Sequence, residues 1–125
     1  MSTNDSKTGE KVIFSCSGAA DVGEIADRTA RALKRDGFAR AVCIAAVGAG
    51  VPGHIETAKG ADVNIAINGC PRGCATKILE SIGVTPVSYE VTAMGFAKGS
   101  SPATQEAVEA VYKTVKEGVA SGSAS

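Results

Sequence analysis

Two cysteines, Cys70 and Cys74, stand three residues apart in the segment NGCPRGC, which covers residues 68–74. The segment closes an apolar run, VNIAI at 63–67, which is typical of a buried strand. Glycines beside each thiol, such as Gly69, allow the backbone to turn tightly at the sulfur atoms. A pair of thiols in so short a turn indicates metal binding or redox chemistry.

We expect Cys70 to lie near the N-terminal cap of a helix. Pro71 has no N–H group and therefore suits the first helical position. Free backbone N–H groups, the positive end of the helix dipole and the nearby Arg72 and Lys77 should then favour the thiolate form of Cys70. A thiolate can ligate a metal ion or attack a disulfide.

The other two cysteines follow or lie within predicted strands. Cys16 ends the run KVIF, and Cys43 lies inside the run AVCIAAV. Zinc requires tetrahedral geometry, and its ligands can come from separate strands. Four thiolates would give a closed site, whereas three would leave an open position. His54, the single histidine, could replace Cys43 as a ligand, or it could be a solvent-facing loop residue.

Apolar runs alternate with amphipathic runs along the chain. We predict strands at 11–14, 39–50 (ending in a glycine-rich turn), 63–67 and 86–95, and helices at 21–37, 71–83 and 102–119, with a short helix or irregular crossover at 52–62. Ser101 is predicted to cap the last helix. The polar segments 1–10 and 120–125 are predicted to be flexible, leaving one domain at 11–119.

Alternating strands and helices predict an α/β fold, a small doubly wound three-layer structure with a four-stranded parallel sheet. The expected strand order is 2-1-3-4, with the weakly alternating fourth strand at an edge. Ligands of such sheets lie beyond the carboxyl ends of the strands. This topology would bring the distant cysteines together at the carboxyl ends of the strands.

Composition excludes several kinds of partner. Thirteen basic residues balance thirteen acidic ones, so no basic surface for nucleic acid or an anionic membrane is expected. The sequence contains no apolar stretch long enough to span a membrane and no signal peptide, which predicts a cytoplasmic protein. The segment GAADVG at 18–23 has glycines at Walker spacing but lacks the following Lys, so nucleotide binding is disfavoured. Asp21 and Glu24 are explained by the dipole of the first helix.

The chain resembles the DGC-domain family of zinc-binding proteins, small cytoplasmic bacterial and archaeal proteins. The resemblance rests on the segments IFSCSGAADVG, VCIAAVGAG and INGCPRGCATKILE, which carry all four cysteines. It implies that Cys43 belongs to the zinc site together with Cys16, Cys70 and Cys74. Asn68 replaces the aspartate of the Asp-Gly-Cys motif; an amide can cap a turn or donate to sulfur but cannot act as a base. Asn68, Gly69 and Arg72 are the residues expected to surround the ligands.

Three functions remain open. The leading hypothesis is a zinc-binding protein with a structural, sensory or metal-handling role. The alternative is a thiol redox enzyme that takes a small sulfur or thiol substrate, in which Cys70 attacks a disulfide or persulfide and Cys74 or Cys16 resolves the intermediate. An iron–sulfur protein ranks last because the second cysteine segment of such sites is absent. The sequence does not specify the oligomeric state.

Overall fold

The computed structural model describes residues 10–16 and 19–121. Its sheet consists of the parallel strands β2 (Lys11–Ser15), β3 (Arg40–Ala41), β4 (Val63–Asn68) and β5 (Val87–Glu90) in the order β3-β2-β4-β5. The helices are α2 (Asp21–Arg35), α3 (Ile44–Gly48), α4 (Pro52–Gly60), α5 (Cys74–Ser81) and α6 (Gln105–Ser121), with a 3-10 helix, η1, at Val91–Met94. The predicted α/β class, strand order and edge position of the last strand are confirmed.

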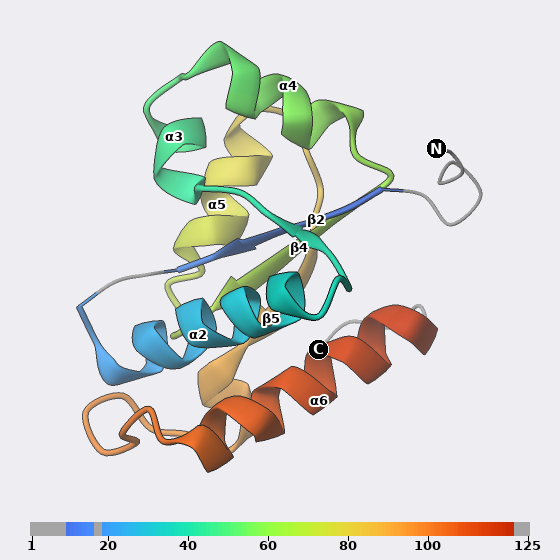
Figure 1. Ribbon diagram of the computed structural model, residues 1–125. Helices are drawn as coiled ribbons and strands as arrows, with labels where there is room; N and C mark the ends of the chain where they lie inside the picture. The colour runs from blue at the N-terminus through green and yellow to red at the C-terminus, as the bar shows by residue number, and fades with distance from the viewer. Residues whose placement is uncertain (1–9, 17–18, 122–125) are drawn as a thin grey trace.

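Helices cover both faces of the sheet (Figure 1). Successive side chains of a strand point to opposite faces, so Ile13 packs toward α2 and α6, whereas Val12 and Phe14 pack toward α3, α4 and α5. The two buried clusters are almost entirely aliphatic and share the sheet as their common wall. This arrangement leaves the carboxyl ends of the strands and the connections that follow them at one edge.

The prediction of a strand at 39–50 is wrong over most of that range. Only Arg40 and Ala41 pair with β2, and residues 44–48 form helix α3. The segment IAAVG is dominated by alanine and other small residues, and alanine is the strongest helix former. Val47 of α3 then packs into the cluster against β2 instead of extending the sheet.

Helix α5 begins at Cys74, three residues after the predicted start at Pro71. Residues 70–73 form a turn that is closed by a hydrogen bond from the Gly73 N–H to the Cys70 carbonyl (3.2 Å). Gly73 itself has a left-handed backbone (φ 61°), a conformation that glycine adopts at low cost. Cys70 therefore lies in a turn, and the predicted placement of Cys70 at the helix cap is wrong.

Two more boundaries differ from prediction. Strand β5 ends at Glu90, and the 3-10 helix η1 follows it. Helix α6 begins at Gln105, where the Thr104 hydroxyl accepts a hydrogen bond from the Ala107 N–H (3.1 Å). The hydroxyl of Ser101, the predicted cap, instead accepts from the Ala97 N–H (2.8 Å).

The predicted terminal segments fall almost wholly outside the described residues. Residues 1–9 and 122–125 are not described, and α6 continues to Ser121, into the segment predicted as a tail. Across the described part of the chain, none of the helices combines the length and apolar character that crossing a bilayer requires.

Candidate thiol site

All four cysteines follow the carboxyl ends of three neighbouring strands. Cys16 comes directly after β2, Cys43 two residues after β3 and Cys70 two residues after β4, while Cys74 opens α5. The prediction that Cys43 lies within a strand is wrong, because Cys43 is the extended residue that precedes α3. All four are free thiols; Cys16 and Cys70 are partly buried, and Cys43 and Cys74 are exposed.

Cys16 continues the hydrogen-bond ladder between the two central strands. Ser15 pairs with Ile67, and the Cys16 N–H donates to the Ile67 carbonyl (2.9 Å). The backbone of Cys16 is therefore fixed beside the end of β4, where the turn that carries Cys70 begins. Cys70 packs partly against the apolar cluster beneath α2 and α6.

The side chain of Asn68 holds the start of α5. Its Oδ1 accepts hydrogen bonds from the N–H groups of Ala75 (3.0 Å) and Thr76 (3.4 Å), and its Nδ2 donates to Thr76 Oγ1 (2.8 Å) and to the Tyr89 carbonyl (3.4 Å). Thr76 Oγ1 also shares a hydrogen bond with Ser88 Oγ (2.8 Å). The amide is only 4% exposed. It therefore fixes both ends of the turn that bears Cys70 and Cys74. These hydrogen bonds join the amide to oxygen atoms and backbone nitrogen atoms rather than to sulfur.

Gly69 lies directly against the first turn of α2. A Cβ atom at this position would lie 2.8 Å from the Gly23 nitrogen and 2.9 Å from the Val22 carbonyl carbon. Both contacts involve backbone, which cannot rotate away as a side chain can. The Gly69 carbonyl also accepts from the Thr92 N–H (3.2 Å). Glycine is thus required for this close approach, whereas Arg72 on the same turn is exposed.

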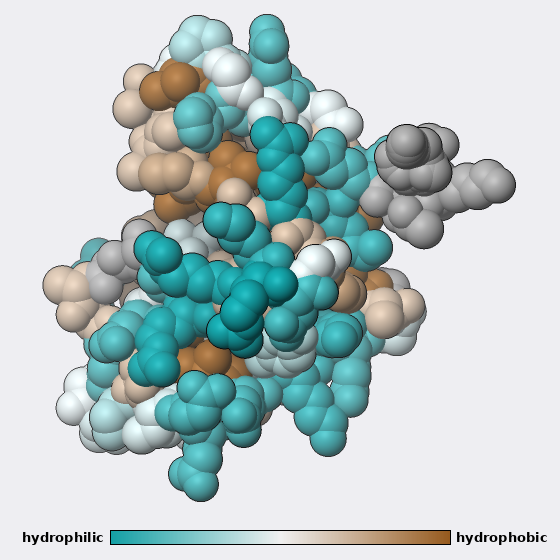
Figure 2. Space-filling view, viewed as in Figure 1, coloured by the Kyte–Doolittle hydropathy of each residue, from teal (hydrophilic) through white to brown (hydrophobic). Residues whose placement is uncertain are grey.

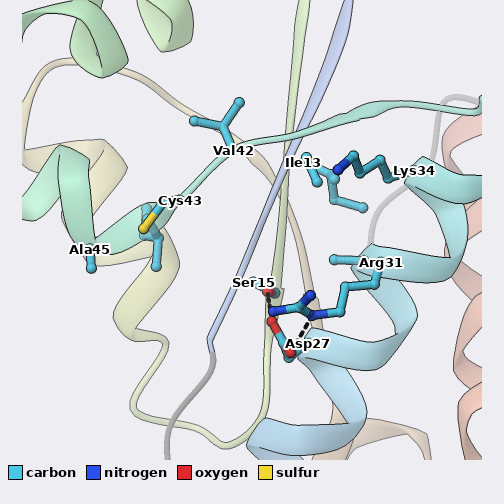
Figure 3. Close-up of a pocket in the computed structure, with 11 residues that line it drawn as sticks. Ile13, Ser15, Asp27, Arg31, Lys34, Val42, Cys43 and Ala45 are labelled. Atoms are coloured by element: carbon cyan, nitrogen blue, oxygen red, sulfur yellow. Dashed lines mark hydrogen bonds and ion pairs between the residues drawn. The ribbon is translucent and has the colours of Figure 1, made fainter.

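Cys43 lines two pockets beside β3. A pocket of about 310 Å³ lies between α2 and the connection from β3 to α3, and Figure 3 shows Ser15, Asp27 and Arg31 across from Cys43. A second pocket of about 340 Å³ is lined by Cys43, His54 and Thr57 among others. The sequence offered His54 either as a replacement for Cys43 or as a solvent-facing loop residue. The loop placement is wrong, because His54 lies in the first turn of α4, where it lines the same pocket as Cys43.

The polar wall of the first pocket was not recognised from the sequence. Asp27, Arg31 and Lys34 follow one another at spacings of four and three residues on α2, which places them on one helix face. Arg31 Nε donates to Asp27 Oδ2 (2.8 Å), and Ser15 Oγ donates to Asp27 Oδ1 (3.4 Å). The spacing of Asp27, Arg31 and Lys34 shows in the sequence that they share one face of a helix. That this face lines a pocket could not be predicted, because the pocket depends on where β3 and α3 lie.

Asp21 has a larger role than the helix dipole suggested. Its carboxylate accepts hydrogen bonds from the N–H groups of Gly99 (2.9 and 3.0 Å) and Ser101 (2.9 Å), as well as from its neighbour Val22 (2.8 Å). The Gly99 and Ser101 hydrogen bonds are the main reasons why the pKa of this carboxyl group lies below its ordinary value of 3.8. Asp21 therefore fastens the loop before α6 to the start of α2.

The described residues do not contain a preformed metal site. Across 10–16 and 19–121, no three His, Cys, Asp or Glu side chains are grouped closely enough to hold an ion. The kind of donor nevertheless fits zinc, since thiolates are its commonest structural ligands and all four thiols are free at one edge of the sheet. Ligation by three or four of them would require side chains or the turns that carry them to move.

Comparisons with known proteins give one family and one relative. The model of the DGC domain matches residues 12–115. The Anaerobic and virulence modulator AnvM of Pseudomonas aeruginosa is 33% identical over 78 residues, which cover 62% of this chain and 60% of that relative. The alignment thus spans less than two thirds of the length of AnvM. No solved structure matches.

Proposed function

This chain belongs to the DGC domain family, and on that premise we propose that it is a zinc-binding protein whose ligands are the thiolates of Cys16, Cys43, Cys70 and Cys74. The observation that carries the proposal is that four free thiols, none fully buried, follow the carboxyl ends of three adjacent parallel strands. This edge is where ligands of doubly wound sheets bind.

The two central strands supply the better organised part of this ligand set. Cys16 is fixed by the ladder to β4, and the turn bearing Cys70 and Cys74 is fixed by Asn68. Cys43 comes from the far side of β2 and would complete a closed site. Zinc held by four thiolates has no open position for substrate, so its contribution would be to stability or to metal sensing. Because no three donors are grouped beforehand, we expect zinc uptake to change the structure of the turns.

The role we propose is sensory and the location cytoplasmic. The relative AnvM is named an anaerobic and virulence modulator, which favours a modulating role over a catalytic one for this chain as well. Thiolate ligands suit such a role because they bind metal only when they are reduced and deprotonated.

Metal analysis of protein prepared without oxygen tests the zinc proposal. The wild type should contain or take up one zinc per chain in competition with a chromogenic chelator. Each Cys→Ser variant at positions 16, 43, 70 and 74 should lose at least about tenfold in affinity, by analogy with the loss caused by removing groups around a metal. Thr85→Ser, an exposed change outside the cysteine segments, is the matched control.

The pattern of loss distinguishes the possible sites. Loss in all four variants supports a closed site, and loss in three only supports an open position. Wild-type protein that neither contains zinc nor takes it up would contradict the proposal.

A thiol redox enzyme is the second candidate. It is favoured by the same accessibility of the four thiols and by the absence of a preformed metal site among the described residues. The sequence assigned the attack to Cys70 because the helix was expected to begin there. The helix begins at Cys74 instead, so we propose Cys74 as the attacking thiol and Cys70 or Cys16 as its resolving partner. Brown protein with visible absorption would instead indicate an iron–sulfur cluster.

A further inference from the structure

The pocket between α2 and the β3–α3 connection has a chemistry of its own. It measures about 310 Å³, at the lower end of the range for small-molecule sites. Ile13, Val42 and Ala45 contribute apolar wall, and Ser15, Asp27, Arg31, Lys34 and Cys43 contribute polar groups. Figure 2 shows mainly hydrophilic side chains over α2 in this view. A ligand of this pocket therefore needs both a short hydrocarbon part and a polar group.

The charges of the pocket favour an anion. Arg31 and Lys34 supply two positive charges against the single carboxylate of Asp27. Asp27 engages Arg31 through Nε (2.8 Å), whereas Lys34 forms no ion pair with any residue of the described part of the chain. The arrangement leaves a net positive charge for a ligand, and Lys34 is the cation free to meet it.

The thiol of Cys43 gives the pocket a reactive group. Cys43 is exposed and unpaired, and it lies on the α3 side of the pocket, opposite the cations of α2 (Figure 3). A ligand whose carboxylate meets Lys34 or Arg31 could thus present a sulfur atom to Cys43. The carboxylate and the sulfur would be separated by the short apolar stretch that Ile13 and Val42 line.

We propose that this pocket binds a small disulfide that carries carboxylate groups and that Cys43 exchanges with it. The Cys43 thiol releases its proton to solvent, and its sulfur attacks one sulfur of the bound disulfide. A new S–S bond forms to Cys43 while the ligand's own S–S bond breaks, and the other half leaves as a thiolate. Cys43 is oxidised by this exchange, and the departing sulfur is reduced. The inference does not depend on zinc, and its test uses metal-free protein.

Two disulfides of similar size and opposite charge test the proposal. Full-length protein freed of metal by a chelator is reacted with dithiodipropionate, which carries two carboxylates, or with cystamine, which carries two ammonium groups. Peptide mass mapping then gives the rate of mixed-disulfide formation at each cysteine. We expect Cys43 to react faster with dithiodipropionate, whereas Cys74, exposed at the start of α5, should not share this preference to the same extent.

Variants of Lys34 identify the source of the preference. Lys34→Gln should lower the ratio of the two rates at Cys43 by about 2- to 5-fold, the effect of one exposed charge pair, and Lys34→Glu should lower it further. Lys113→Gln, which removes an exposed lysine of α6 away from the pocket, is the matched control and should leave the ratio unchanged. Raising the salt concentration should also reduce the ratio.

Three outcomes would overturn the inference. The first is that Cys43 forms no adduct. The second is that Cys43 and Cys74 prefer dithiodipropionate over cystamine to the same extent. The third is that the ratio of the two rates at Cys43 is the same in Lys34→Gln as in the wild type. None of them bears on zinc binding, because the metal-binding assay is separate. Conversely, if the protein takes up no zinc but Cys43 still reacts faster with the anionic disulfide, the zinc proposal is contradicted and the inference about the pocket is supported.

Discussion

The turn between β4 and α5 and the connection between β3 and α3 both carry cysteine, yet they are held in different ways. In the first, Asn68 bonds the start of α5 and Gly69 packs on the backbone of α2. In the second, the strand has only two paired residues, and Cys43 precedes α3 without a side-chain cap. One region fixes its thiols through buried contacts, and the other leaves its thiol beside two pockets.

This difference assigns different properties to the two regions. Hydrogen bonds and close packing around Cys70 and Cys74 limit how far these thiols can move without loss of stability. Cys43 has fewer such contacts, because the neighbouring Val42 N–H donates to the Ile13 carbonyl (3.0 Å) but the thiol itself is exposed. It should therefore approach a metal ion or a small ligand at a lower energetic cost than Cys70 or Cys74. Variants that disturb the β4–α5 turn should therefore change the properties of Cys70 and Cys74 and leave Cys43 unaffected.

Gly69→Ala should have the largest effect. Its Cβ would lie 2.8 Å from the Gly23 nitrogen, so the turn or the start of α2 must shift. Overpacking of this kind costs about 1–3 kcal/mol in the free energy of unfolding, and thermal or urea unfolding measures it. Gly53→Ala in α4 is the control, since nothing lies within 4 Å of its new Cβ; it should be neutral or stabilising by up to about 1 kcal/mol. Equal stability of the two variants would contradict the close contact.

Asn68→Ala should destabilise the protein by about 1–3 kcal/mol because it leaves buried N–H groups at the start of α5 without their acceptor. Asn68→Asp keeps an acceptor for Ala75 and Thr76 but loses the donor to the Tyr89 carbonyl and to Thr76 Oγ1. The Thr76 hydroxyl can itself donate to a carboxylate, so the loss of stability should be smaller than in Asn68→Ala. Urea unfolding measures both.

The Asn68→Ala variant also tests whether the β4–α5 turn and the β3–α3 connection are independent. In Asn68→Ala, alkylation of Cys74 should accelerate while alkylation of Cys43 stays at the wild-type rate. A comparable change at Cys43 would show that the two regions are coupled and would remove the contrast on which this comparison rests.

Asp21→Asn should have the smallest effect, and that effect should depend on pH. The pKa of Asp21 is lowered mainly by the hydrogen bonds from Gly99 and Ser101. The carboxylate therefore contributes its full stability above the ordinary value of 3.8, and this contribution is lost as the pH falls through the lower value of the folded state. The stability difference between the wild type and Asp21→Asn should narrow on acidification, as measured by unfolding at a series of pH values.

Glu24→Gln is the control for this prediction. Glu24 stands on the same turn of α2 but accepts no hydrogen bond from the described residues 99–101, and its carboxylate lies 3.9 Å from Arg28. If the stability difference between the wild type and Asp21→Asn does not change with pH, the proposed bridging role of the Asp21 carboxylate is contradicted.

The sequence by itself determined the class of the fold, the parallel order of the strands and the edge at which the cysteines lie. These features follow from local information, because a continuous apolar run such as 63–67 predicts a buried strand and the helical crossovers predict parallel neighbours. Asn68 was also correctly expected to be able to cap a turn, since its amide can both donate and accept.

Only the tertiary structure decided where the helices begin beside the thiols and what surrounds Cys43. The start of α5 depends on Asn68, which reaches seven and eight residues along the chain, and the Asp21 contacts join residues 78 to 80 positions apart. The pocket beside Cys43 forms only when α2 packs next to the short strand β3. Such contacts have no signature in local spacing, because their energy arises from groups that meet only after the chain has folded.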